Sequence, residues 1–419
     1  MEIQPRPYGS DTLVVGVDIA KSSHVAVFQS PDFVFSKPFT FANTRKGFEA
    51  FRDWINAAAV KAGTARVIIA LEPTGHYWKP LGEFLQAEQL EIRMVSTVLT
   101  KRVKDMLDNS PLKTDAKDAR VIADLARQGR SRPQYVQTTD VQELRYLVEL
   151  RERFNREKTA CLNRLHRLLD LLFPEILGMF SRIDCKSILA LIEAAPTPAA
   201  ALQLGVAELA ALLERASNHY YGTAKALQIL DAAQSSIGCK QGITPLVFEV
   251  LVVVPRIRDF DRLLIELEAE MAEVLSKVDY GPLLLTIPGF GVLTASVVVA
   301  ELGDLRLYRN ARQVLKMAGL NLFERSSGYH RGQRRITKRG RSLLRKILYL
   351  AVLRQAGEKG IFGEYFKKFG PDKPKPKIAV ASMRRLLRMI FAMVRDNKAF
   401  TPGLVAPAQT KETPVLKAA

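Results

Sequence analysis

Four carboxylic acids in the first third of the chain have positions that suit a metal-dependent reaction. Asp18 ends a first apolar segment, and Glu72 ends a later β-branched one. Asp115 and Asp118 follow Thr114, a typical helix-capping residue, and their i,i+3 spacing places both on one helix face. Oxygen ligands alone suit Mg²⁺ or Mn²⁺ rather than Zn²⁺. The pattern predicts a metal site in which two ions about 4 Å apart could serve phosphoryl transfer.

Each of these acids also has a simpler structural interpretation. A strand-end Asp is commonly a turn or cap residue, Asp115 could be a favourable charge at a helix N-terminus, and Asp118 could be an exposed helix residue. Basic residues flank the acids at Lys113 and within residues 95–105. A channel for nucleic acid would need such residues to bind phosphates. This neighbourhood favours the catalytic interpretation.

A second candidate is the serine pair Ser326 and Ser327, which precedes Gly328 in a basic segment. A serine hydroxyl is a poor nucleophile unless a base, a metal or a cationic pocket assists it. On residue types alone a Ser-Ser-Gly sequence is usually only a turn, so this segment in isolation is weak evidence for catalysis. The basic side chains that we expect to bind nucleic acid here are Arg331, Arg334, Arg335, Lys338, Arg339, Arg341 and Arg345.

The sequence IPGFG at 287–291 resembles the turn of a helix-hairpin-helix. In that motif the glycines expose backbone N–H groups at a helix N-terminus, where they can hold a DNA phosphate. Gly289 and Gly291 are therefore candidate nucleic-acid-binding residues. A glycine-rich turn between packed helices has the same pattern, and this alternative stays open.

The positive charge is concentrated near the C-terminus. The 419 residues include 62 Lys and Arg against 43 Asp and Glu, a formal net charge of +19. Residues 305–400 hold 25 of the basic and 5 of the acidic residues, so the whole excess lies there. This concentration indicates a polyanionic partner, most often nucleic acid, with a solvated basic surface as the alternative. A hydrophobic content of 47% excludes a mostly disordered chain.

Other residue counts exclude several classes of protein. The cysteines, Cys161, Cys185 and Cys239, are too few and too scattered for a disulfide framework or a cysteine zinc site. No apolar run reaches the length of about 18 residues that would span a bilayer. The N-terminal residues lack the apolar core of a signal peptide. We therefore expect a cytoplasmic protein with no membrane partner.

The N-terminal part of the chain has the pattern of an α/β domain with a mixed sheet, over residues 10–135. Short β-branched runs bounded by turn residues alternate there with segments of helical spacing. We expect strands at 13–20, 24–30, 38–43, 65–72 and 91–96, and helices at 44–63 and about 76–88.

The rest of the chain is expected to be mostly helical. Within 138–280, two long helical stretches have heptad-like spacing, which predicts a coiled coil or a paired-helix arm around a helical insert at 185–245. The first stretch has the cations Arg151 and Lys158 at seam positions. Helices that only cover their own domain's core are the alternative. A basic, mostly α domain should follow at 281–400, and a disordered tail at 401–419.

Several of these segments together resemble, in sequence and in order, the DEDD transposases of the insertion-sequence 110 family, described as bridge-RNA-guided recombinases. The match covers residues 13 to about 355. The segments that carry it are GVDIAK (16–21), LEPTGHY (71–77), KTDAKDA (113–119), IPGFG (287–291) and AGL…SSG…RRITKRG…LR (318–345).

The resemblance implies a RuvC-like domain of the ribonuclease-H fold at about 10–135, whose acidic tetrad would be catalytic and hold Mg²⁺ or Mn²⁺. The tetrad would be Asp18, Glu72, Asp115 and Asp118. The C-terminal transposase domain would supply a serine that forms a covalent phosphoserine link to DNA. The family's serine precedes a glycine, which favours Ser327 and leaves Ser326 as second choice.

The resemblance also implies the partners. A coiled-coil module would lie between the two domains, and the protein would form a homo-oligomer, dimer or tetramer, in which the acidic site of one subunit meets the serine of another. A structured non-coding guide RNA would pair with donor and target DNA. The implied setting is a bacterial or archaeal cytoplasm, in association with the nucleoid.

We therefore expect a DNA transposase or recombinase of an insertion sequence. One alternative is a RuvC-like metal-dependent junction nuclease, which would hydrolyse strands without rejoining them. The other is a non-catalytic nucleic-acid-binding scaffold whose acids are structural.

Overall fold

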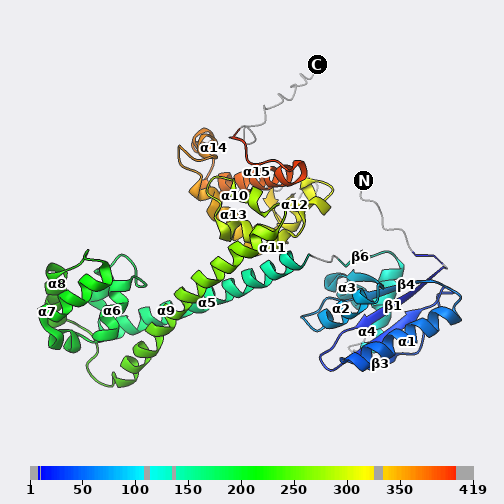
Figure 1. Ribbon diagram of the computed structural model, residues 1–419, viewed down its shortest axis with the longest axis horizontal. Coiled ribbons are helices and arrows are strands. Elements are labelled where there is room, and N and C mark those ends of the chain that lie inside the picture. Colours follow the sequence, from blue (N-terminus) through cyan, green and yellow to red (C-terminus); the bar gives the residue numbers. More distant parts are fainter. Residues whose placement is uncertain (1–7, 10, 108–113, 135–137, 325–333, 403–419) are drawn as a thin grey trace, which may run out of the picture. The chain divides into compact units, whose positions relative to one another are not determined.

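The structure is a computed structural model that describes residues 8–9, 11–107, 114–134, 138–324 and 334–402. It divides into two compact units, Met1–Val136 and Gln137–Ala419 (Figure 1). Nearly all of the predicted disordered tail lies outside the described residues. The secondary structure confirms a mixed α/β sheet in the first unit and a mostly helical second unit.

The first unit is built on a six-stranded sheet with the order β3-β2-β1-β4-β5-β6. Strands β1, β4 and β5 run parallel, whereas β2, β3 and β6 are antiparallel to their neighbours. The strands are β1 (Thr12–Asp18), β2 (Ser23–Gln29), β3 (Phe39–Ala42), β4 (Arg66–Leu71), β5 (Glu91–Val95) and β6 (Ser131–Pro133). This mixed sheet is compatible with a ribonuclease-H-like fold.

Helices cover both faces of the sheet because its central strands are apolar on both sides. Leu13, Val15 and Val17 of β1 pack with helices α1 (Arg45–Lys61) and α2 (Trp78–Ala87) on one face. Val14 of β1 lies on the other face, where it joins a core formed with α3 (Thr97–Leu107) and α4 (Asp115–Arg127).

Gly16 determines how closely α4 approaches the sheet. A Cβ atom added at Gly16 would overlap with backbone atoms of Ala119 and Ala123 in α4. Gly16 lies between Val14 and Asp18 on the face of β1 that α4 covers, since side chains alternate along a strand. The missing side chain therefore lets the backbone of α4 lie directly on the strand that ends at Asp18.

The second unit contains a pair of long helices, α5 (Thr139–Leu172) and α9 (Thr244–Lys277), which lie side by side (Figure 1). The heptad side chains Ile257, Met271 and Val274 of α9 are buried. At one end of the pair, α5 and α9 share a core with a group of short helices. These are η1 (Pro174–Gly178), α6 (Lys186–Ala194), α7 (Pro198–Ser217) and α8 (Thr223–Gln234). A coiled coil between subunits stays a prediction.

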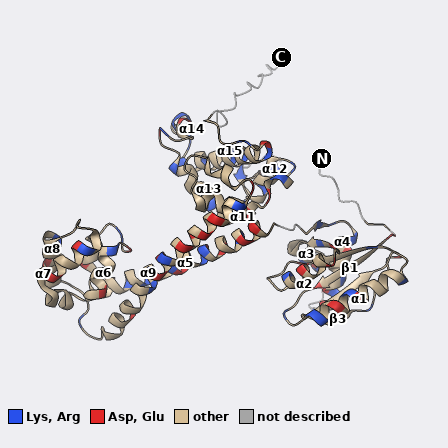
Figure 2. Cartoon of the chain, viewed as in Figure 1, with Lys and Arg blue, Asp and Glu red and all other residues tan. Residues whose placement is uncertain are grey.

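Ion pairs account for the two cations at seam positions of α5. Arg151 Nη2 lies 2.6 Å from Glu268 Oε1 of α9. Lys158 Nζ lies 2.6 Å from Asp261 of α9 and 3.2 Å from Asp184. Charged residues of both signs mark this pair of helices (Figure 2). Each seam cation thus has a carboxylate on the facing helix, which favours one register of α5 against α9.

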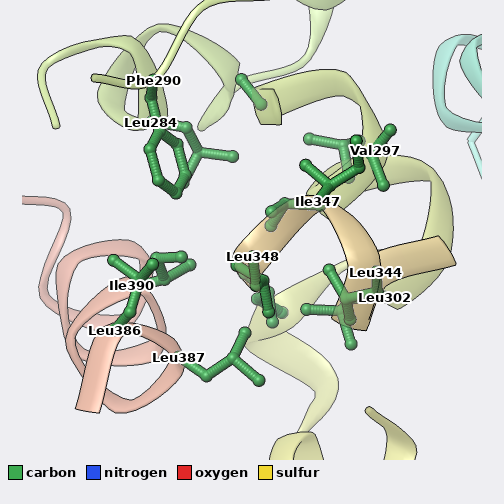
Figure 3. Close-up of a cluster of buried hydrophobic side chains, with 14 of the residues drawn as sticks. Leu284, Phe290, Val297, Leu302, Leu344, Ile347, Leu348, Leu386, Leu387 and Ile390 are labelled. Carbon is green, nitrogen blue, oxygen red and sulfur yellow. The ribbon is translucent and has the colours of Figure 1, made fainter. Parts of the chain in front are cut away.

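A second core joins the other end of α5 and α9 to the C-terminal helices. Within it, side chains of α10, α11, α13 and α15 meet, among them Leu284, Val297, Leu348 and Ile390 (Figure 3). The elements of this region are α10 (Gly281–Leu285), α11 (Val292–Leu302), η2 (Leu305–Leu307), α12 (Ala311–Met317), β7 (Leu322–Phe323), β8 (Arg335–Ile336), α13 (Ser342–Arg354), α14 (Gly363–Phe369) and α15 (Lys375–Asp396).

Within the described residues, no single helix combines the length and apolar character of a membrane span. Helices α6 and α7 pass this test only when taken together, and they are bent by 111° with respect to each other.

We predict that Gly16→Ala lowers the free energy of unfolding by roughly 1–3 kcal/mol, because the added methyl group must push α4 away from β1. Urea denaturation of the full chain, followed by circular dichroism, measures the change. Gly178→Ala is the control, since nothing lies within 4 Å of a Cβ atom at Gly178. Equal stability of Gly16→Ala and the wild type would contradict the close approach.

Candidate active site

The sheet places Asp18 and Glu72 side by side. Strands β1 and β4 are parallel neighbours in which Gly16 pairs with Ala70 and Val17 pairs with Leu71. Asp18 and Glu72 are the next residues in each chain segment, at the carboxyl ends of the two strands. Because side chains alternate along a strand, Asp18 lies on the same face as Gly16, and Glu72 lies on the same face as Ala70. This is the face that α4 covers.

The first turn of α4 brings the other two acids to this edge. Thr114 caps the helix, and its side-chain oxygen accepts a hydrogen bond from the backbone N–H of Lys117 at 3.4 Å. Asp115 and Asp118 both lie in the first turn, where the helix dipole favours negative charge. Asp115 is exposed and Asp118 is only 4% exposed. The interpretation of Asp118 as an exposed helix residue is therefore wrong.

The other three acids affect the ionisation of Asp18. Burial, followed by the negative charges of Asp118, Asp115 and Glu72, raises the pKa of Asp18 from its ordinary value of 3.8 to about 6. Lys104 has the opposite effect on the pKa of Asp18. A carboxylate whose pKa is raised by three other carboxylates lies where negative charge outweighs the positive charge of Lys104.

Lys104 is a member of this site that the sequence did not single out. Its Nζ lies 2.6 Å from Oδ2 of Asp118, and its side chain is 28% exposed. Lys104 lies on α3, which packs against α4. The sequence offered only a general signal, the cluster of basic residues at 95–105, because the pairing of α3 with α4 is a tertiary contact.

The four acids fit a hard divalent cation by donor chemistry, since carboxylate oxygens are the ligands that Mg²⁺ and Mn²⁺ prefer. In the described part of the chain, no three or more His, Cys, Asp or Glu side chains lie close enough together to hold a metal ion. The four carboxylates would therefore have to move closer together to bind a cation.

In the second unit, a short β-ladder holds the two ends of the serine segment. Leu322 pairs with Ile336, and Phe323 pairs with Arg335. Next to this ladder, Arg334 Nε lies 2.9 Å from Glu324 Oε2. Four predicted site residues lie outside the described residues, namely Lys113, Ser326, Ser327 and Arg331.

The basic loop after β8 is fastened to the end of α12. The backbone N–H groups of Lys338 and Arg341 donate to the carbonyl oxygens of Gly319 and Met317, each at 3.0 Å. Gly340 has no room for a side chain against Met317 and Gly319. The loop thus has a fixed backbone from which exposed cations project.

Apart from Arg334, the described cations that were predicted to bind nucleic acid fall into two groups. Arg335, Lys338 and Arg339 are exposed, and they form no ion pair within the described residues. Arg341 and Arg345 are half-buried and have protein partners. Arg341 Nε lies 3.5 Å from Glu301, whose pKa is raised by burial, and Arg345 donates to the carbonyl oxygen of Ala318 at 2.9 Å.

The two glycines of the 287–291 turn are exposed at the start of α11. Gly289 has a φ of +76°, a conformation that favours glycine, and a Cβ atom there would collide with the side chain of Gln355. Gly291 is the N-cap residue of α11, and no side chain caps this helix end. The helix-hairpin-helix interpretation stays a prediction.

Comparison with known proteins gives matches in both units. A family model described as a transposase matches residues 15–174, which include the four acids. A second model, described as the transposase IS116/IS110/IS902 family, matches residues 281–367, which include the turn, the serines and the basic loop.

Individual relatives agree with these matches. A protein of insertion element IS116 from Streptomyces clavuligerus is 30% identical over 303 residues, 70% of this chain and 73% of that protein. A protein of insertion element IS110 from Streptomyces coelicolor is 25% identical over 394 residues, 91% of this chain and 94% of that protein. A pilin gene-inverting protein from Moraxella bovis is 33% identical over 122 residues, 28% of this chain and 38% of that protein.

We predict that Asp18→Asn stabilises the metal-free protein near neutral pH. The folded state disfavours the ionised carboxylate, so wild-type stability falls as pH rises from 3.8 to about 6 and stays lower above that. At a pH of about 7.5 the variant should be more stable by roughly 1–2 kcal/mol. The difference is this small because solvent screens the partly exposed carboxylate. At pH values of about 4 the two proteins should be equally stable.

Urea denaturation at both pH values, in a chelating buffer, measures this difference. The exposed acid Asp32 provides a control, Asp32→Asn. A variant at Asp18 that is less stable than the wild type near neutral pH would show that the carboxylate has a structural role.

Proposed function

The chain belongs to the insertion-sequence 110 family of transposases, and we propose that it cuts and rejoins donor and target DNA through a phosphoserine intermediate. Family membership makes it a transposase, an enzyme that acts on DNA. The observation that carries the finer proposal is the grouping of Asp18, Glu72, Asp115 and Asp118 at one sheet edge. We further propose that residues 10–135 form a RuvC-like domain, 138–280 a helical middle region and 281–400 the serine transposase domain.

The acidic tetrad would bind Mg²⁺ or Mn²⁺. When bound, the ion would supply positive charge beside the scissile phosphate. The chain's own contribution is to hold four carboxylates in place from two strands and one capped helix. Their mutual repulsion, expressed in the raised pKa of Asp18, is a reason for the site to take up a cation.

Ser327 would be the nucleophile, with Ser326 as second choice. Its Oγ would attack the scissile phosphorus, so that a Ser–O–P bond forms as the bond to the 3′-oxygen breaks. The serine proton would pass to a base at the site, and the 3′-oxygen would leave as a hydroxyl. A 3′-hydroxyl of the second DNA would then attack the phosphoserine and release the serine, which conserves the phosphodiester.

The remaining partners are also proposals. The exposed cations of the basic loop and the turn at Gly289 and Gly291 would bind phosphates, and a structured non-coding guide RNA would select donor and target DNA. The charge excess of residues 305–400 supports an extensive polyanionic partner. We propose that a homo-oligomer brings the acidic site of one subunit to the serine of another, and that the protein associates with the nucleoid.

We predict that a covalent protein–DNA adduct forms in the wild type and is lost in Ser327→Ala but retained in Ser326→Ala. The assay uses the full chain with Mg²⁺, donor and target DNA and the transcript that flanks the gene. Denaturing gels with labelled DNA detect the adduct. Loss of the adduct only in Ser326→Ala would identify Ser326 as the nucleophile.

Strand cleavage without any adduct in the wild type would favour a metal-dependent junction nuclease. Asp18→Asn provides the complementary control, because it should abolish cleavage while DNA binding persists. No cleavage by the wild type, together with DNA binding that neither Asp18→Asn nor removal of divalent ions changes, would favour the scaffold alternative, in which the acids are structural.

We predict that Arg339→Ala weakens DNA binding and its salt dependence together. Each lost phosphate contact should make the slope of log affinity against log salt less steep by roughly 0.9. Lys346→Ala is a matched control, since Lys346 Nζ already lies 2.9 Å from Glu152. Fluorescence anisotropy over a range of KCl concentrations gives the slopes. Equal slopes for Arg339→Ala and the wild type would exclude Arg339 from the phosphate contacts.

A further inference from the structure

We propose that Lys104 is a built-in competitor for the divalent cation, which occupies Asp118 until the metal displaces it. The inference rests on the proposed metal site. It goes beyond that site because it assigns a role to a lysine and makes metal loading an exchange of one cation for another.

The ion pair between Lys104 and Asp118 has the features of an occupied cation position. The distance from Nζ to Oδ2 is 2.6 Å, and the side chain of Asp118 is only 5% exposed. A carboxylate this deeply buried requires a positive partner, because an unpaired buried charge is strongly unfavourable. Lys104 meets this requirement in the absence of a metal.

The surrounding charges make the lysine exchangeable. Asp115 lies in the same helical turn as Asp118, and α4 packs on the strand that ends at Asp18, so Lys104 lies beside several carboxylates. A divalent cation would bring twice the charge and could contact several carboxylates at once, whereas one ammonium group reaches Asp118. Lys104 is still 28% exposed, so its flexible side chain has a route to solvent.

Two consequences follow for the acidic site. While Lys104 holds Asp118, that carboxylate oxygen is not free to contact a metal ion. Once the metal displaces it, the ammonium group becomes available to bind a phosphate of the DNA strand. Metal binding and phosphate binding would then support each other.

The first test measures Mn²⁺ binding by the full chain without nucleic acid, using the electron paramagnetic resonance signal of free Mn²⁺. Lys104→Met removes the competing charge and should bind Mn²⁺ about tenfold more tightly than the wild type. Lys104→Arg keeps the charge and should bind no more tightly than the wild type. Lys101→Met is the matched control, because Lys101 is exposed on the same helix and should have no effect.

A second measurement on the wild type does not depend on whether Lys104→Met folds. Amine acylation with mass-spectrometric readout compares Lys104 and Lys101 with and without Mg²⁺. The modification rate of Lys104 should rise several-fold when Mg²⁺ is added, because the paired ammonium is released. The rate of Lys101 should stay constant.

The outcomes separate this inference from the site on which it rests. Mn²⁺ binding that is lost in Asp18→Asn but unchanged or weaker in Lys104→Met, with a constant acylation rate of Lys104, would overturn the competitor role alone. A wild type that binds no Mn²⁺ would overturn the inference and the metal site together.

Discussion

The absence of a side chain at Gly16 sets the distance between β1 and α4, and the acidic site depends on that distance. With α4 lying on the strand, the first helical turn stands over the strand end, and acids from three elements become neighbours. This proximity has an electrostatic penalty, seen in the raised pKa of Asp18. The helix dipole and Lys104 offset part of it. The fold thus holds together charges that would otherwise separate.

The second unit uses backbone contacts for a comparable purpose. The loop that carries Lys338 and Arg339 is fastened to the end of α12 by its own N–H groups, and Arg345 and Arg384 cap the carbonyl oxygens of Ala318 and Leu320. Some arginines therefore bind the chain segment that follows α12, whereas others, such as Arg335 and Arg339, are exposed. Basic composition alone cannot distinguish the two roles, since both need the same residue type.

The sequence predicted the strands that carry the site because they are short apolar runs with clear ends. Glu72 directly precedes a proline, and Asp18 follows five apolar or glycine residues. It did not predict β6, whose three residues include a proline, nor the partner of Lys104, which comes from another helix. The sequence also indicated no partner for the seam cations of α5. Arg151 pairs with Glu268 and Lys158 pairs with Asp261, and each acid lies more than 100 residues away in the sequence. Tertiary pairing of this kind has no local sequence signal.

The helical core at one end of α5 and α9 is made of one continuous stretch of chain, from Leu165 to Ile257. Its first residue lies on α5 and its last residue on α9, and these two helices lie side by side. We call the pair of helices the arm, and the chain leaves and re-enters it at the same end. Adding the same number of turns to α5 and α9 would therefore lengthen the arm between this core and the C-terminal core without changing either core.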